Sequence, residues 1–194
     1  MTHIIWTRLW SLALLGFLAP AAPPAQSKLP LSLEAIAINL SNVGPTGPTR
    51  VEMKIERWST DEERDKLRDA LIEKGPEALM TALQKVKPRV GYIRTTTSLA
   101  WDIQYARETL LPSGSRRIVF ATDRPMSFVE AAQNLRSAEY DFMLAELRIG
   151  PDGKGEGKLV PRAKVSYNKD TRTIEIEDYA SQPVRLSEVR VSGH

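Results

Sequence analysis

The chain contains no cysteine, and its two histidines, His3 and His194, lie close to its two ends. The absence of cysteine excludes disulfide bonds and thiol nucleophiles, so a domain of this sequence must be stabilised by its hydrophobic core. Without a histidine in the body of the chain, Ser-His-Asp triads and zinc sites built on Cys or His are excluded as well. Carboxylates, lysine, arginine, tyrosine, serine and threonine remain for catalysis or ligand binding. We predict no metal site and no cofactor.

The chain also lacks a strong excess of charge of either sign. It has 27 Lys and Arg against 24 Asp and Glu, which gives a formal net charge of +3. Basic and acidic residues alternate along the chain, and no basic stripe of the kind that binds a phosphate backbone is present. We therefore predict no nucleic-acid partner.

The first 27 residues have the composition of a secretory signal peptide. Arg8 precedes a short apolar run, residues 9–19, and small residues follow at two possible cleavage sites, residues 19–21 and 25–27. The apolar run is shorter than the ~20 residues that a membrane-spanning helix requires. We predict an exported protein, periplasmic or extracellular, with residues 1–27 as the signal and residues 28–194 as one domain. Cleavage would leave no stable membrane span, whereas an uncleaved N-terminal anchor is the alternative.

Period-two alternation dominates the remainder of the chain and predicts antiparallel strands joined by short turns. Two helices interrupt this pattern after the second strand, at 60–74 and 76–86, with Gly75-Pro76 between them and with Ser59 and Glu62 at capping-box spacing. A further short helix is one interpretation of residues 124–140, and a parity change near Ser187-Glu188 indicates a β-bulge. The fold class is α+β, dominated by about eight antiparallel strands in a barrel or a sandwich. Nine segments have the strand pattern on which this estimate of about eight is based, and they span residues 33–40, 51–58, 89–95, 99–108, 116–123, 141–149, 158–167, 172–178 and 184–191.

The glycine-rich segment GPDGKGEGK, residues 150–158, could be taken for a phosphate or metal loop. A dinucleotide fingerprint or a P-loop would need a helix after the glycines, but the next residues alternate as a strand does. A calcium loop that began at Asp152 would need an acid at its twelfth position, where Lys164 stands. The segment therefore predicts a hairpin connection, because Asp-Gly favours tight turns.

Aromatic and basic residues on three successive expected strands form the main candidate for a binding site. If their faces coincide, they would make an aromatic floor with guanidinium donors for an anionic or sugar-like ligand. Packing across strands, with the arginines paired to surface acids, is the alternative. The long connection that follows the last of these strands is a second place for a site. The candidate ligand-binding residues are Tyr92, Arg94, Trp101, Tyr105, Arg107, Asp123 and Arg124.

Pairs of carboxylates could support a hydrolase, in which one group acts as an acid and the other as a base or nucleophile. The chain is rich in acids, so the presence of candidates is weak support by itself. The carboxylates considered are Asp102, Asp123, Glu130, Asp141, Glu146, Glu175 and Glu177.

Several blocks of the sequence, RWSTDEERDKL, RVGYIRT, AWDIQYAR, RRIVFATDRPMSF, GEGKL and IEIEDYASQPVRLSEVRV, resemble a family of uncharacterised exported bacterial proteins. The resemblance covers residues from about 50 to 191 and implies export and a single domain, and it carries no activity or site residues. Together with the missing catalytic motifs, it favours a non-enzymatic binding or accessory module that holds a small amphipathic or anionic ligand or contacts an envelope protein. The alternatives are a carboxylate-based hydrolase and a structural, envelope-interaction protein without a pocket.

Overall fold

The computed structural model describes residues 27–40, 47–96, 98–125, 142–178 and 182–192. Within these residues, nine strands form one antiparallel sheet in the order β6-β5-β4-β3-β2-β1-β9-β7-β8. The strands are β1 (Leu31–Asn39), β2 (Gly47–Ile55), β3 (Gly91–Thr95), β4 (Trp101–Leu110), β5 (Arg116–Thr122), β6 (Phe142–Ile149), β7 (Lys154–Asn168), β8 (Thr173–Asp178) and β9 (Val184–Val191).

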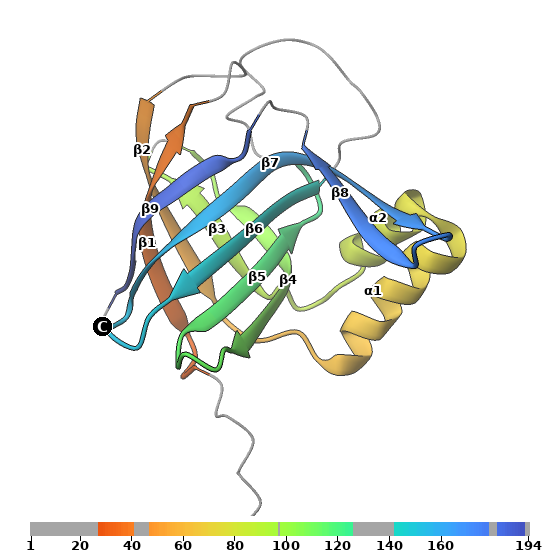
Figure 1. Ribbon diagram of the computed structural model, residues 1–194, viewed down its shortest axis with the longest axis horizontal. Helices are drawn as coiled ribbons and strands as arrows, with labels where there is room; N and C mark the ends of the chain where they lie inside the picture. The colour runs from red at the N-terminus through yellow and green to blue at the C-terminus, as the bar shows by residue number, and fades with distance from the viewer. Residues whose placement is uncertain (1–26, 41–46, 97, 126–141, 179–181, 193–194) are drawn as a thin grey trace, which may run out of the picture.

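A pairing between β6 and β7 closes the sheet into an eight-stranded barrel and leaves β8 outside it (Figure 1). The predicted antiparallel α+β fold is confirmed, and of the two architectures proposed from the sequence the barrel is the one formed. Closure gives each barrel strand a hydrogen-bonded neighbour on both sides. β8 pairs with β7 alone, as the last strand in the order.

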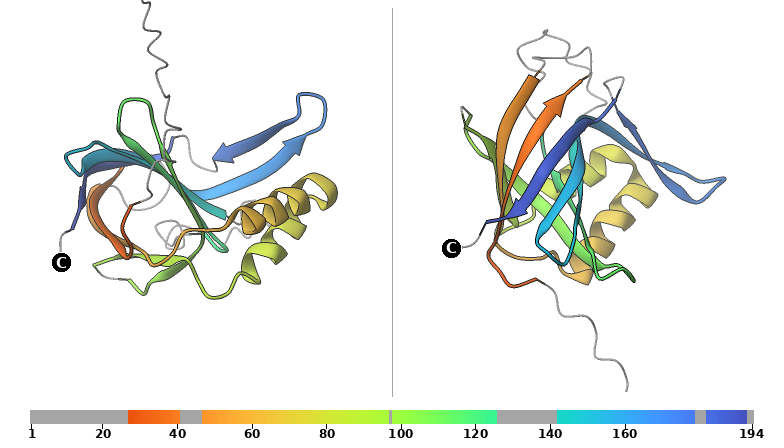
Figure 2. Two further views of the ribbon diagram at one scale, coloured as in Figure 1. Left: turned by 90° about the horizontal axis from the view of Figure 1, so that it is seen from below. Right: turned by 60° about the vertical axis from the view of Figure 1, so that its left-hand side comes forward.

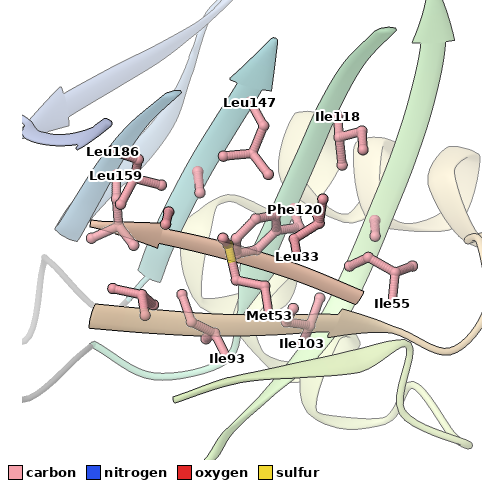
Figure 3. Close-up of a cluster of buried hydrophobic side chains, with 14 of the residues drawn as sticks. Leu33, Met53, Ile55, Ile93, Ile103, Ile118, Phe120, Leu147, Leu159 and Leu186 are labelled. Atoms are coloured by element: carbon pink, nitrogen blue, oxygen red, sulfur yellow. The ribbon is translucent and has the colours of Figure 1, made fainter. Parts of the chain in front are cut away.

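The barrel interior is filled by side chains from every second residue of its strands. Phe120, Met53 and Leu33 point toward one another in the middle of this core (Figure 3). Each of these side chains is 2% exposed or less. A ligand inside the barrel would have to displace such groups, because protein interiors are packed to crystal-like density.

Two helices, α1 (Asp61–Lys74) and α2 (Pro76–Gln84), follow β2 as predicted. Gly75 separates them with a φ of 92°, which the glycine accepts without strain. The capping box is formed by Thr60 and Glu63, not by Ser59 and Glu62 as expected. Ser59 is turned inward instead, where its hydroxyl accepts a hydrogen bond from the backbone N–H of Ala106 at 3.1 Å. The spacing of a capping box fits both pairs of residues. The hydrogen bond between Ser59 and Ala106 of β4 keeps Ser59 from capping the helix and leaves that role to Thr60.

The helix pair lies against the outer face of the barrel (Figure 2), which confirms the prediction that its apolar side covers a sheet. A second hydrophobic cluster, separate from the barrel core, joins the helices to β6 and β7. Its buried members are Leu67, Leu71, Leu79, Leu83, Phe142, Ala163 and Val165. We call α1, α2, β8 and residues 161–168 of β7 the annex.

Two local predictions are confirmed by the strand registers. An extra residue on β9 shifts its pairing with β1 between Ser187 and Arg190, and Glu188 adopts a φ of 50° at this bulge. The glycine-rich segment is the β6–β7 hairpin, in which the Gly150 N–H donates to the carbonyl of Lys154 at 2.7 Å. At Gly155 a Cβ would lie 2.0 Å from the Arg148 carbonyl oxygen, so the close approach of the two strands requires glycine there.

Three sequence-based expectations fall partly or wholly outside the described residues. The short helix expected within residues 124–140, the carboxylates Glu130 and Asp141, and nearly all of the signal segment belong to this group. Among the helices of the described part of the chain, none has the length and apolar character needed to cross a membrane.

Candidate functional site

The aromatic and basic residues chosen from the sequence do not share one face. Trp101 is 8% exposed and belongs to the barrel core, together with Ile103. A register shift between Ile103 and Tyr105 interrupts the alternation of β4, so that Tyr105 packs outside the barrel in the cluster beneath the helices. Burial there raises the pKa of the Tyr105 phenol. Trp101 and Tyr105 share a parity in the sequence but lie on opposite faces of β4, because strict alternation does not hold across a bulge.

Tyr92 and Arg94 lie on the outer face of β3 within a network of ion pairs. The guanidinium groups of Arg89 and Arg94 approach the Tyr92 ring, at 5.4 and 5.9 Å from its centroid. Arg94 donates to Glu52 at 2.7 Å. Arg89 bridges Glu56 and Asp102, at 3.2 and 2.8 Å. An anionic ligand would have to displace acids already bound to both arginines.

The remaining candidates are dispersed. Arg107 donates to Asp61, at the start of α1, at 2.7 Å, and thereby ties β4 to the helix. Asp123 and Arg124 lie at the described start of the long connection, and Arg124 donates to the Ala100 carbonyl at 3.3 Å. The structure therefore gives these predicted residues mainly structural contacts, and their role in ligand binding stays a prediction.

A different surface, which was not among the predicted binding sites although it includes Glu146 and the end of the glycine-rich segment, has a depression of about 690 Å³ on the outer face of β6, β7 and β9. We call it the β6–β7–β9 depression. Side chains that point outward from these strands form its walls, Gly157 contributes backbone alone, and the segment that enters β9 forms its rim. The residues that line it are Glu146, Arg148, Glu156, Gly157, Lys158, Gln182, Pro183 and Arg185.

Cations stand directly opposite one another across this surface. Lys158 of β7 is in register with Arg185 of β9, and Arg117 of β5 is in register with Arg148 of β6. Residues directly opposite on antiparallel strands point to the same side with their Cβ atoms about 5 Å apart, so like charges there repel. Across β6 and β7, Lys158 also stands opposite Glu146 and Arg148 opposite Glu156, so these acids offset much of the positive charge.

The acids of the depression are already engaged by arginine. The carboxylate of Glu146 accepts from Arg117 at 2.8 Å and from Arg148 at 3.1 Å, and the bonds from Arg117 lower its pKa more than burial raises it. Glu156 faces Arg185 at 3.7 Å. Lys158 has no acid within ion-pair distance among the described residues. Three cations and two acids thus line the depression, with Arg117 beside it, and a bound anion would balance the remaining positive charge.

A carboxylate-based hydrolase would need a general acid among its carboxylates. A general acid needs a raised pKa. The carboxyl pKa values that are displaced here, those of Asp61, Glu62, Glu63 and Glu146, are all lowered. The described part of the chain also contains no group of three or more His, Cys, Asp or Glu side chains that could hold a metal ion.

Comparison of the chain with protein-family models, with curated proteins and with solved structures gives no match. The barrel with its annex therefore has to be interpreted from its own geometry. The sequence held a signal for the depression that was missed. Charged residues alternate with apolar or glycine positions on both strands beside the hairpin, at Glu146 and Arg148 and again at Glu156 and Lys158.

Proposed function

We propose that the protein is an exported, non-enzymatic binding or accessory module that holds a small anionic ligand in the β6–β7–β9 depression. The observation that carries the proposal is the opposition of Lys158 and Arg185 across β7 and β9, where like charges face one depression. Glu156 and Glu146 already offset part of the repulsion between these cations, and a carboxylate or phosphate between the two would add two attractions. The packed barrel core favours a surface site over a site in the barrel interior.

Two observations favour binding over catalysis. The body of the chain offers no cysteine or histidine for nucleophilic or acid–base chemistry. In the depression, Glu146 is held ionised by two arginines, which suits a structural counterion better than a proton donor.

Calorimetric titration with inorganic phosphate and with citrate tests the proposal. We expect at least one of these anions to bind the wild-type protein, with an affinity that falls as salt is added. Lys158→Glu should weaken binding by about tenfold or more, since one charge-assisted contact of this kind is worth about 1.5–3 kcal/mol. The matched control is Lys87→Glu, because Lys87 is exposed and lies away from the depression. No binding of either anion by the wild type, or equal binding by the Lys158→Glu variant, would refute the proposed site.

The same variant gives a second readout. Without ligand, Lys158→Glu places opposite charges across β7 and β9 but like charges across β6 and β7, where Glu146 stands opposite residue 158, so its melting temperature should change little. Added phosphate should raise the melting temperature of the wild type and leave that of the variant unchanged, because only a bound ligand stabilises the folded state.

Export is tested by the N-terminal sequence of the mature protein. Ser27 donates from its backbone N–H and its hydroxyl to Glu108, and the side chain of Glu108 is only 4% exposed beside Arg116. Loss of Ser27 would remove two donors from a buried carboxylate. We therefore expect cleavage at the upstream site, residues 19–21, so that Ser27 is retained. An unprocessed N-terminus would contradict export with cleavage, and a mature chain that begins at Lys28 would contradict this choice of site.

A further inference from the structure

The strand β8 ends the sheet and presents an open edge. Its six residues pair with β7 from Ala163 to Asn168, and no strand of the described residues pairs with its other side. The β7–β8 hairpin projects beyond the barrel on the side where the helices lie (Figures 1 and 2). An edge strand exposes a row of backbone donors and acceptors that another extended chain can pair with.

One face of this edge strand is apolar and uncovered. The exposed fractions of Ile174 and Ile176 are 49% and 58%. They stand opposite Tyr167 and Val165 of β7, and Val165 is buried beneath the helices. The apolar face thus continues from a covered part of β7 to an uncovered part of β8. A docked strand would bury both isoleucines, which is the driving force for association.

The other face of β8 is acidic. Glu175 and Glu177 alternate with the two isoleucines, Asp178 ends the strand, and β8 contains no basic residue. On the β7 side, Glu177 stands opposite Lys164, and Glu175 accepts from the side chain of Asn168 at 2.8 Å. Such charges oppose pairing with a second copy of the same strand. In an antiparallel two-fold pair, the register that sets both isoleucines of each copy beside isoleucine also sets Glu175 beside Glu175. A register shifted by one residue sets glutamate beside isoleucine instead.

We propose that β8 is a docking edge for an extended segment of another protein in which lysine or arginine alternates with aliphatic residues. Such a segment would add a strand to the sheet, with its aliphatic side chains beside Ile174 and Ile176 and its basic side chains beside Glu175 and Glu177. The basic residues provide specificity, because an acidic segment of the same pattern would be repelled.

The experiment uses the full mature protein and short synthetic peptides in fluorescence anisotropy. The probe alternates lysine with valine, one control alternates glutamate with valine, and a second control groups the lysines and valines in two blocks. We expect the alternating basic peptide to bind in preference to both controls. We also expect its binding to protect the backbone amides of β8 from hydrogen exchange.

The variant Ile176→Lys should weaken binding of the basic peptide by about tenfold or more, because it removes a buried aliphatic contact and adds a like charge. The fold should tolerate this change, since Ile176 is more than half exposed. Leu110→Lys is the matched control, because Leu110 is 45% exposed on β4 and lies outside the annex. The proposal is overturned if both lysine variants bind equally well or if the block peptide binds as tightly as the alternating one. It is also overturned if the protein dimerises through β8.

Discussion

The barrel and the annex of this protein bury hydrophobic residues in two different ways. In the barrel, each strand has a neighbour on both sides, and the side chains of all eight strands meet in one closed core. In the annex, two helices rest on one outer strip of the sheet, and the sheet ends in the open strand β8. A closed sheet leaves no strand edge for other chains, whereas an open annex presents an edge and an apolar face. We therefore expect the barrel to provide most of the stability, and the annex and the outer surface to provide the sites of interaction.

Truncation of Phe120 at the centre of the barrel should have the largest effect on stability. The side chain of Phe120 is fully buried. Phe120→Ala should lower the free energy of unfolding by about 3–5 kcal/mol, because it removes a large apolar group and leaves a cavity. Denaturant titration measures this change, and both regions should unfold together. The control Leu110→Ala, at an exposed position, should change stability little. A loss under about 1 kcal/mol for Phe120→Ala would contradict the assignment of the main core.

Truncation of Leu83 tests whether the annex is a separate cooperative unit. Leu83 is 2% exposed and belongs to the cluster beneath the helices. Leu83→Ala should destabilise the annex by about 2–4 kcal/mol. Hydrogen exchange should show lost protection in α1 and α2 while the barrel strands stay protected. Glu73→Ala, on the exposed side of α1, serves as the control. Equal loss of protection in both regions would show that they form one unit.

The helix cap provides a smaller test of the annex. Thr60 accepts from the backbone N–H of Glu63 at 3.2 Å, and the Glu63 carboxylate accepts in return from the N–H of Thr60 at 3.0 Å. Thr60→Ala should cost about 1 kcal/mol of annex stability, as measured by hydrogen exchange of the first turn of α1. Glu62→Gln should cost less, since Glu62 is not the reciprocal partner in the box. A larger loss of protection for Glu62→Gln than for Thr60→Ala would instead support the capping pair expected from the sequence, Ser59 and Glu62.

The pH dependence of the annex should show the smallest effect. Hydrogen bonds from Arg57 hold the pKa of Glu63 below its usual range, and burial opposes them in part. A lowered pKa in the folded state stabilises the fold above the ordinary pKa of glutamate, about 4.3, and this contribution is lost as pH falls through the lowered value. Annex protection should therefore decrease on acidification more in the wild type than in Glu63→Gln. An identical pH profile for the two proteins would show that this ion pair contributes nothing measurable.

Local patterns predicted most of the elements because the forces that form them are local. Alternation at Val51, Met53 and Ile55 marked the inward face of β2, and Gly75-Pro76 marked the boundary between the helices. The candidate site was less predictable. A single register shift on β4 separated Trp101 from Tyr105, and no local pattern at that point indicates a bulge. The depression depends on pairs such as Lys158 and Arg185, which are far apart in the chain and meet through sheet register alone.

The sequence by itself determined the antiparallel strands, the helix pair and the hairpin of the glycine-rich segment, because backbone preferences and hydrophobic periodicity act over a few residues. It also determined which side chains are available for chemistry, since the body of the chain has neither cysteine nor histidine. The tertiary structure decided that β6 pairs with β7 to close the barrel, that β8 remains outside it, and that cations oppose one another across β7 and β9. Such outcomes depend on the packing of distant residues, and a shift of one residue in register reverses which face a side chain occupies.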